Sequence, residues 1–193
     1  MKASVQIATS LDGFIARLDG GLDWLPGADG KEPESGVLMK VGTTEEPEDF
    51  GFVAFMNSVD HLVMGRNTFE LVVSFGEWPY PMPVTVITST LKKLPEVFAG
   101  KGLDIDFSSS SPLEIYENLE RAGRKHLYID GGKTIQSFLN AGLIDEISIN
   151  KIPVIIGSGI PLFGPLTADV KLEHLNTNSY ANGFVSSHYK VKK

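Results

Sequence analysis

The chain has 193 residues, of which 42% are hydrophobic, and carries a formal net charge of −7 at pH 7. This length predicts a single domain over residues 1–193 with a buried core, and the acidic balance argues against a nucleic-acid or membrane-surface partner. The absence of cysteine excludes disulfides, thiolate chemistry and cysteine-held zinc.

No stretch is apolar and long enough to span a bilayer, and residues 1–4 lead into an alternating pattern rather than a signal peptide. We therefore expect a cytoplasmic protein. The four histidines show no i, i+4 pairing and no carboxylate companion of the kind found in metal sites, which predicts no metal site.

Residues 2–9 alternate and then become apolar, which predicts a first strand. A turn at residues 10–13 leads to a short return over residues 14–16, and glycines follow at residues 20 and 21. Residues 27–46 are polar and rich in glycine, so we predict a surface loop there.

A helix is predicted next, with one acid on an otherwise apolar face. The spacing i, i+3, i+4, i+7 is followed by Asp49, Phe52, Val53 and Met56. Desolvation by these neighbours would raise the pKa of Asp49, and its carboxyl could bind the N–C–NH2 edge of a pterin or aminopyrimidine. The alternative is a helix-start acid that interacts with the helix dipole, and Glu48 is the second candidate for the catalytic role.

A short apolar run over residues 61–64 predicts a central strand that ends at Gly65. The glycine allows close backbone approach, and we predict a polar-capped helix that begins at Thr68 and reaches about Val73. A helix N-terminus with the guanidinium of Arg66 beside it is a natural site for an anion such as phosphate.

The β-branched residues 84–87 predict a buried parallel strand, which is followed by small hydroxyl residues and a lysine pair. Another strand is predicted over residues 103–107. Ser111 and Glu114 form a capping box with Pro112 at the first helical position, so we assign these residues a structural role. That helix is predicted to run to Arg121.

Residues 126–129 predict a strand, which is followed by a glycine turn at residues 130–134 and a helix over residues 135–140. This order places free backbone N–H groups at a second helix N-terminus, where a pyrophosphate could bind. A P-loop is rejected because its first glycine position is occupied by Leu127.

The C-terminal part predicts a strand and a glycine-rich bend, and then an antiparallel pair over residues 171–175 and 183–191. Strands separated by helices, followed by an antiparallel end, predict a mixed, mainly parallel sheet with helices on both faces. A ligand is expected at the carboxyl edge of these strands.

The pattern of Asp49, then fifteen residues, then Gly65, Arg66 and Thr68 resembles the centre of the dihydrofolate reductase family. Residues 142–163 resemble instead the reductase domain of riboflavin biosynthesis, the RibD C-terminal family. The resemblance covers nearly all of the chain. It implies a dihydrofolate reductase-like three-layer α/β/α fold, with a mixed, mainly parallel central sheet and antiparallel C-terminal strands.

The resemblance also implies NADPH as the cofactor. In the family, the loop after the strand at residues 84–87 holds the adenosine 2′-phosphate together with Arg66, and Lys92 is a further candidate unless it is a solvated lysine. Backbone groups of Ala8 and Ile15 correspond to those that hold the nicotinamide amide. The resemblance implies cofactor contacts by Ala8, Ile15, Gly65, Arg66, Asn67, Thr68, Thr88, Ser89, Gly131, Gly132, Lys133 and Thr134, and substrate contacts by Trp24, Phe52 and Val53.

The sequence therefore predicts an NADPH-dependent reductase of a pteridine or aminopyrimidine-type heterocycle, with Asp49 as the catalytic residue and a homodimer as the expected assembly. One alternative is the 5-amino-6-(5-phosphoribosylamino)uracil reductase of riboflavin biosynthesis, but residues 75–79 replace the stretch that binds the ribose phosphate in that pathway. Another alternative is a dinucleotide-binding protein without turnover.

Overall fold

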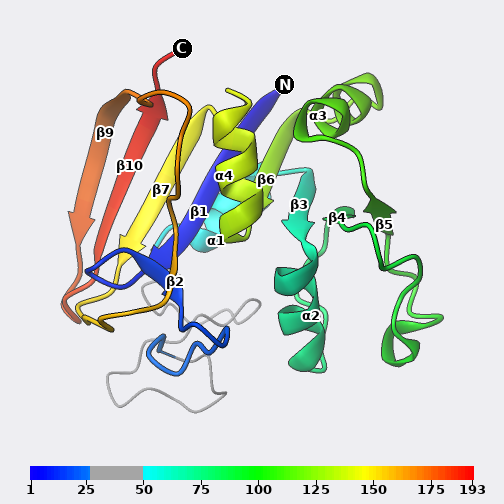
Figure 1. Cartoon of the computed structure of the whole chain (residues 1–193), viewed down its shortest axis with the longest axis horizontal. Coiled ribbons are helices and arrows are strands. Elements are labelled where there is room, and N and C mark those ends of the chain that lie inside the picture. The colour runs from blue at the N-terminus through cyan, green and yellow to red at the C-terminus, as the bar shows by residue number, and fades with distance from the viewer. Residues whose placement is uncertain (27–49) are drawn as a thin grey trace. The chain divides into compact units, whose positions relative to one another are not determined.

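A computed structural model describes residues 1–26 and 50–193 of the protein (Figure 1). Within these ranges the chain forms two compact units. The first contains Met1–Val5 and Ser58–Asp145, and the second contains Gln6–Asn57 and Glu146–Lys193. A single domain over residues 1–193 stays a prediction.

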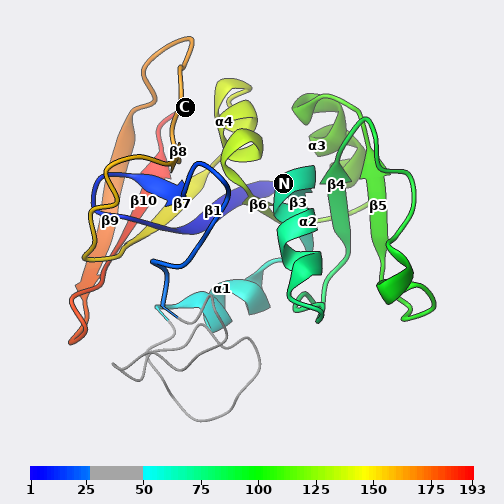
Figure 2. The same ribbon diagram turned by 60° about the horizontal axis from the view of Figure 1, so that its bottom comes forward.

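The first unit is built on parallel strands in the order β5-β4-β3-β6-β1, of which Figure 2 shows β3, β4 and β5 side by side. The residues of these strands are mostly buried, because a parallel sheet made of apolar runs is covered on both faces. In β3, for example, every residue from His61 to Met64 is buried. The strands are β1 (Lys2–Thr9, of which Lys2–Val5 belong to this unit), β3 (His61–Gly65), β4 (Val84–Ile87), β5 (Ile105–Ser108) and β6 (His126–Asp130).

Parallel neighbours require crossover connections, and helices provide them. Helix α2 (Arg66–Ser74) connects β3 to β4, and α3 (Pro112–Arg121) connects β5 to β6. A 3-10 turn, η1 (Glu96–Phe98), lies between β4 and β5, and α4 (Gly132–Asn140) follows β6. Each crossover returns the chain to the amino ends of the strands, so that the next strand runs parallel to the previous one.

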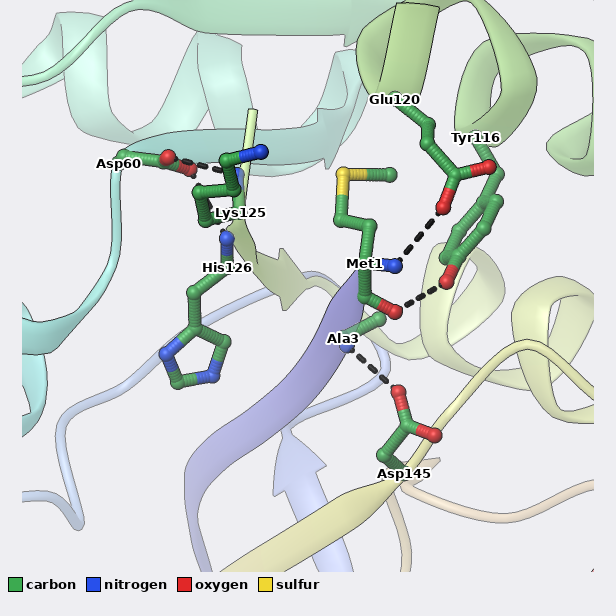
Figure 3. A network of polar contacts seen from close by, with 8 residues as sticks. All are labelled: Met1, Ala3, Asp60, Tyr116, Glu120, Lys125, His126 and Asp145. Atoms are coloured by element: carbon green, nitrogen blue, oxygen red, sulfur yellow. Dashed lines mark hydrogen bonds and ion pairs between the residues drawn. The ribbon is translucent and has the colours of Figure 1, made fainter. Parts of the chain in front are cut away.

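The amino ends of these strands are held by polar contacts (Figure 3). Asp60 accepts hydrogen bonds from the backbone N–H groups of Lys125 (2.7 Å) and His126 (3.1 Å), and Asp145 accepts one from Ala3 (2.8 Å). The same region contains contacts of Met1 with Glu120 and Tyr116. With these ends occupied by structural contacts, the carboxyl ends remain available for a ligand.

The second unit contains strands in the order β1-β7-β10-β9, with β1 contributing Gln6–Thr9. β10 (Val185–Val191) pairs antiparallel with both β7 (Glu146–Lys151) and β9 (Leu172–Ser179). A separate antiparallel pair joins β2 (Phe14–Ala16) to β8 (Ile160–Pro161), and α1 spans Phe52–Ser58. A small core is formed by Phe50, Ile152 and Phe184.

The α/β fold with a mainly parallel sheet and antiparallel C-terminal strands is confirmed.

Two predicted helix starts are wrong. Helix α2 begins at Arg66 rather than Thr68, and its N-cap is Gly65 without a side-chain cap. Helix α4 begins at Gly132 rather than Ile135, with Gly131 as the N-cap. Both errors arise because glycine supplies the turn geometry with no side chain to mark the cap.

The helices in the part of the chain that the structure describes are all too short or too polar to cross a membrane.

Candidate functional site

Two helices of the first unit begin beside each other at the carboxyl edge of the sheet. Strands β3 and β6 are parallel neighbours with Met64 opposite Asp130. Each strand leads directly into a helix, so that α2 begins at Arg66 and α4 at Gly132. The first N–H groups of a helix lack partners within it, and the helix dipole places positive potential there. Adjacent helix starts are therefore suited to bind an extended, multiply charged anion.

Glycine is required at both turns by the packing between them. Gly131 has φ of 87°, and a Cβ at this position would overlap Oγ1 of Thr68. At Gly65, a Cβ would lie 2.9 Å from Oγ1 of Thr134. Each turn therefore receives a threonine side chain from the first turn of the other helix. These two turns, at Gly65 and Gly131, which we call the cradle, therefore have no room for a larger residue.

The N-terminus of α3 provides an internal comparison. There the hydroxyl of Ser111 accepts the N–H of Glu114 at 3.3 Å, and the Glu114 carboxylate accepts the N–H of Ser111 at 2.8 Å. This capping box, which was predicted from the sequence, is confirmed. Helices α2 and α4 have glycine caps with no side-chain hydrogen bond. Their first turns are thus not closed by a side chain in the way that α3 is.

Arg66 lies beside the loop that follows β4, as the resemblance implied. Its Nη1 donates to Oγ1 of Thr90 at 3.3 Å, and its Nε lies 3.8 Å from a carboxylate oxygen of Glu70. The side chain is 46% exposed, so the guanidinium remains accessible to a ligand. Thr88 orders the loop, since its Oγ1 accepts N–H groups from Thr90 at 3.2 Å and Leu91 at 3.1 Å.

A cavity of about 520 Å³ opens beside this loop. Its lining includes the predicted residues Thr88 and Ser89 together with Lys92, and it also includes Lys93 and Asp106. The local basic patch that a phosphorylated ligand needs is therefore present in an acidic protein. Arg66 and the two lysines supply it.

The first unit thus brings together most of the predicted cofactor contacts. Asn67 and Lys133 are exposed in the first turns of α2 and α4, and Gly132 is buried at the start of α4. The N–H of Gly131 is not free, because it donates to Oδ1 of Asp130 at 2.7 Å. The N–H groups beyond it, in the first turn of α4, are the ones left for a ligand.

Asp130 is a titratable group that the sequence analysis missed. It ends β6 directly before the Gly131 turn and is partly buried. This burial raises the pKa of the Asp130 carboxyl to about 6, while hydrogen bonds from the N–H of Gly131 and the hydroxyl of Tyr128 oppose the rise. An acid directly after a predicted parallel strand, at the start of a glycine turn, was the available signal.

The remaining described candidates lie in the second unit. Ala8 and Trp24 pack against the core of Phe50, Ile152 and Phe184, and Ile15 is partly buried in β2. The ring of Phe50 stacks on Phe184 at a centroid distance of 4.8 Å. Gln6 donates to the carbonyl of Phe50 at 3.4 Å. Phe50, which directly follows position 49, is therefore part of a buried aromatic cluster.

Helix α1 only partly fits the predicted apolar face. Met56 is buried and Phe52 is partly buried, but Val53 is 48% exposed. Val53 therefore does not belong to the core of this unit. Asp49, Glu48 and the loop at residues 27–46 lie outside the described residues.

Comparisons with known proteins cover the whole chain. A family model described as the RibD C-terminal domain matches residues 2–186. The uncharacterized protein YwjB of Bacillus subtilis (strain 168) is 30% identical over 190 residues, which cover 97% of this chain and 97% of YwjB.

Solved structures are similar over the same length. A protein from Shewanella sp. PV-4, named as a candidate riboflavin biosynthesis protein, is 37% identical with a TM-score of 0.83, and the match covers 100% of both chains. Dihydrofolate reductase from Enterococcus faecalis, solved with NADP(H), has a TM-score of 0.61 and 18% identity, and the match covers 100% of this chain and 97% of that one. The second likeness concerns the fold alone.

Proposed function

Because the chain belongs to the RibD C-terminal domain family, we propose that it is an NADPH-dependent reductase of a small heterocycle of the pteridine or aminopyrimidine type. The observation that carries the proposal is the pair of glycine-capped helix starts with Arg66 beside them. These groups suit a dinucleotide with several phosphates, because neither helix start is capped by a side chain and the first N–H groups of a helix lack partners within it.

Different residues would bind different parts of the cofactor. The first turns of α2 and α4 would hold the pyrophosphate, and Arg66 with Thr88, Ser89 and Lys92 would hold the 2′-phosphate. When bound, NADPH supplies the hydride. The protein then has to orient the acceptor, exclude water and manage one proton.

We assign the proton and the orientation of the acceptor to Asp49. A carboxyl group can hydrogen-bond an N–C–NH2 edge, which orients the ring and favours protonation of the C=N bond that is reduced. The apolar residues Phe52 and Val53, which the resemblance implies as substrate contacts, suit a flat ring. Glu48 is the second candidate for this role.

The cofactor assignment is tested by the change in affinity at Arg66. We expect Arg66→Ala to weaken NADPH binding by about tenfold or more, because a charge-assisted contact to the 2′-phosphate is lost. NADH lacks that phosphate, so its affinity should change little. The measurement is a fluorescence titration of both dinucleotides, with Arg121→Ala on α3 as the control. Equal losses for NADPH and NADH would contradict the assignment.

The catalytic assignment is tested by turnover. The absorbance of NADPH is followed with dihydrofolate, a dihydropteridine and the ribosylaminopyrimidine side by side. Asp49→Asn should keep NADPH affinity within about twofold and lower turnover of the accepted substrate by about a hundredfold or more. Turnover unchanged in Asp49→Asn would return this residue to a structural role at the helix start.

A second candidate function is the 5-amino-6-(5-phosphoribosylamino)uracil reductase step of riboflavin synthesis. It is favoured by the full-length likeness to the Shewanella protein named for this pathway. Against it, residues 75–79 replace the stretch that the resemblance associates with binding of the ribose phosphate. At that place Phe75 is 53% exposed, and Trp78 packs edge-on against Phe69. Turnover of the ribosylaminopyrimidine alone in the assay above would favour this candidate over the pteridine.

The third reading is a dinucleotide-binding protein without turnover. It shares the cradle of Gly65 and Gly131 with the first proposal. Tight NADPH binding combined with no oxidation of NADPH by any of the three substrates would favour it.

A further inference from the structure

A carboxylate is built into the turn where the proposed cofactor phosphates would bind. Oδ1 of Asp130 accepts the N–H of Gly131 at 2.7 Å, and Gly131 is the N-cap of α4. The turn has φ of 87° and is fixed by the packing of Thr68. Asp130 therefore holds the turn in place, but it does so with a negative charge at the positive end of a helix.

Two tyrosine side chains, Tyr80 and Tyr128, interact with Asp130. The hydroxyl of Tyr128, two residues earlier on the same face of β6, hydrogen-bonds its carboxylate. Burial raises the pKa of Tyr80, and the charge of Asp130 raises it further. Burial also raises the pKa of Tyr128, so its phenol stays neutral and can donate to Asp130. Lys133, in the first turn of α4, is exposed to solvent.

An ionised carboxylate in this place has two opposing effects. It accepts the Gly131 N–H and so keeps the glycine turn in its left-handed conformation. It also repels any phosphate bound to the first turn of α4, because like charges repel and a partly buried site screens them less than bulk water does. A protonated carboxyl keeps the carbonyl oxygen as an acceptor and removes the repulsion.

We propose that Asp130 is a positioning residue that couples dinucleotide binding to the uptake of a proton. This inference rests on the proposed function, since it concerns the same cradle. The bound phosphates favour the neutral carboxyl, so binding draws a proton onto Asp130 and the turn is held by a neutral group in the complex.

The sign of the effect follows from the pKa of the free protein. At pH 7.5, a carboxyl with a pKa near 6 is mostly ionised, and binding must overcome the repulsion. As the pH falls through about 6, the free protein is already protonated at Asp130 and the repulsion disappears. Asp130 therefore does not oppose binding at low pH, and it weakens binding as the pH rises through about 6.

The test is the number of protons taken up when NADP⁺ binds, measured by calorimetry in two buffers with different ionisation enthalpies. At pH 6.5, we expect wild-type protein to take up about 0.5 proton more than Asp130→Asn, as for a pKa shift of about one unit. Asn keeps the acceptor for the Gly131 N–H and removes only the charge. The 2′-phosphate also titrates near pH 6, but it contributes alike to both proteins.

Two further variants complete the experiment. Asp104→Asn removes an exposed carboxylate at the start of β5 and should match wild type. Tyr128→Phe removes the hydroxyl that stabilises the ionised carboxylate, so the pH of maximal uptake should move upward. Tyr128→Phe decides the question if Asp130→Asn does not fold.

Equal proton uptake by wild type and Asp130→Asn overturns the inference, as does an unchanged pH profile in Tyr128→Phe. Failure of wild type to bind NADP⁺ at any pH has a different meaning. It overturns the proposed function, and the inference falls with it.

Discussion

His61 illustrates how a buried side chain makes stability depend on pH. It is 3% exposed in β3, and its Nε2 lies 2.8 Å from Oγ1 of Thr85 on β4. Burial lowers the pKa of His61 to about 4. Because the unfolded chain has a histidine pKa near 6.5, the unfolded state binds the proton more tightly, and stability is lost as the pH falls from about 6.5 toward 4.

We predict that this histidine lowers the free energy of unfolding by about 2 kcal/mol between pH 7 and pH 5. The measurement is urea unfolding at both pH values. The matched variant is His61→Leu with Thr85→Val, which removes both hydrogen-bonding partners and leaves no orphaned hydroxyl. The pKa of Asp130 is raised and acts in the opposite direction, but it is common to both proteins. An equal pH response in wild type and the double variant would show that His61 is not the cause.

At the scale of single residues, the sequence predicted contacts that depend on local spacing. Arg66 was expected beside the loop after residues 84–87, and its hydrogen bond to Thr90 places it there. The raised pKa of the Asp130 carboxyl could not be predicted from local spacing, because it depends on burial and on the hydrogen bond from Tyr128. Burial of this kind depends on three-dimensional packing rather than on neighbours in the sequence.

The turn between β6 and α4 is the element on which the cradle depends. Gly131→Ala combines a positive φ with a collision against Thr68, and we expect it to lower the free energy of unfolding by about 3 kcal/mol or more. Gly142→Ala, just after the end of the same helix, is the control. Its φ is 67° and nothing lies within 4 Å of the added Cβ, so the cost should be about 1 kcal/mol. Similar urea midpoints for the two variants would remove the packing argument.

Helix α3 provides the opposite case, in which an N-terminus has a purely structural role. We predict that Ser111→Ala lowers the free energy of unfolding by about 1 kcal/mol, since the capping box is lost. NADPH affinity should stay within about twofold of wild type. Thermal unfolding and the fluorescence titration together test this, and a loss of cofactor affinity would mean that α3 also contributes to the site.

The same contrast explains which helix starts were predictable. The start of α3 is encoded in Ser111, Pro112 and Glu114, which are close in sequence and have characteristic side chains. The starts of α2 and α4 have glycine caps, so no side chain marks them. Their proximity depends on the pairing of β3 with β6, which joins residues far apart in the chain.

For the whole molecule, we propose a homodimer that uses the edge of β9 with which no other strand of residues 1–26 and 50–193 pairs. Every residue of this strand is exposed, and Leu172 and Leu175 are 38% and 44% exposed. β9 pairs with β10, and its other edge is a template for a second copy. Sedimentation equilibrium should give about twice the chain mass of 21.0 kDa. Leu175→Lys should shift the measured mass toward that of the monomer, whereas the control Leu113→Lys on α3 should not. A monomeric wild type would contradict the proposal.

The general architecture was readable from the order of apolar runs and turns, because parallel strands with crossover helices leave a strong pattern in sequence. The division into Met1–Val5 with Ser58–Asp145, and Gln6–Asn57 with Glu146–Lys193, was not readable. It cuts through the single strand β1 between Val5 and Gln6, where no turn or loop signal marks a boundary in the sequence.

The proposed function requires that the adjacent starts of α2 and α4 bind the dinucleotide. A crystal structure of the protein with NADP⁺ is the decisive measurement. We predict pyrophosphate oxygens within hydrogen-bond distance of N–H groups in Gly132–Thr134, and the 2′-phosphate against the guanidinium of Arg66. A dinucleotide bound elsewhere, with these helix starts free of phosphate, would contradict it.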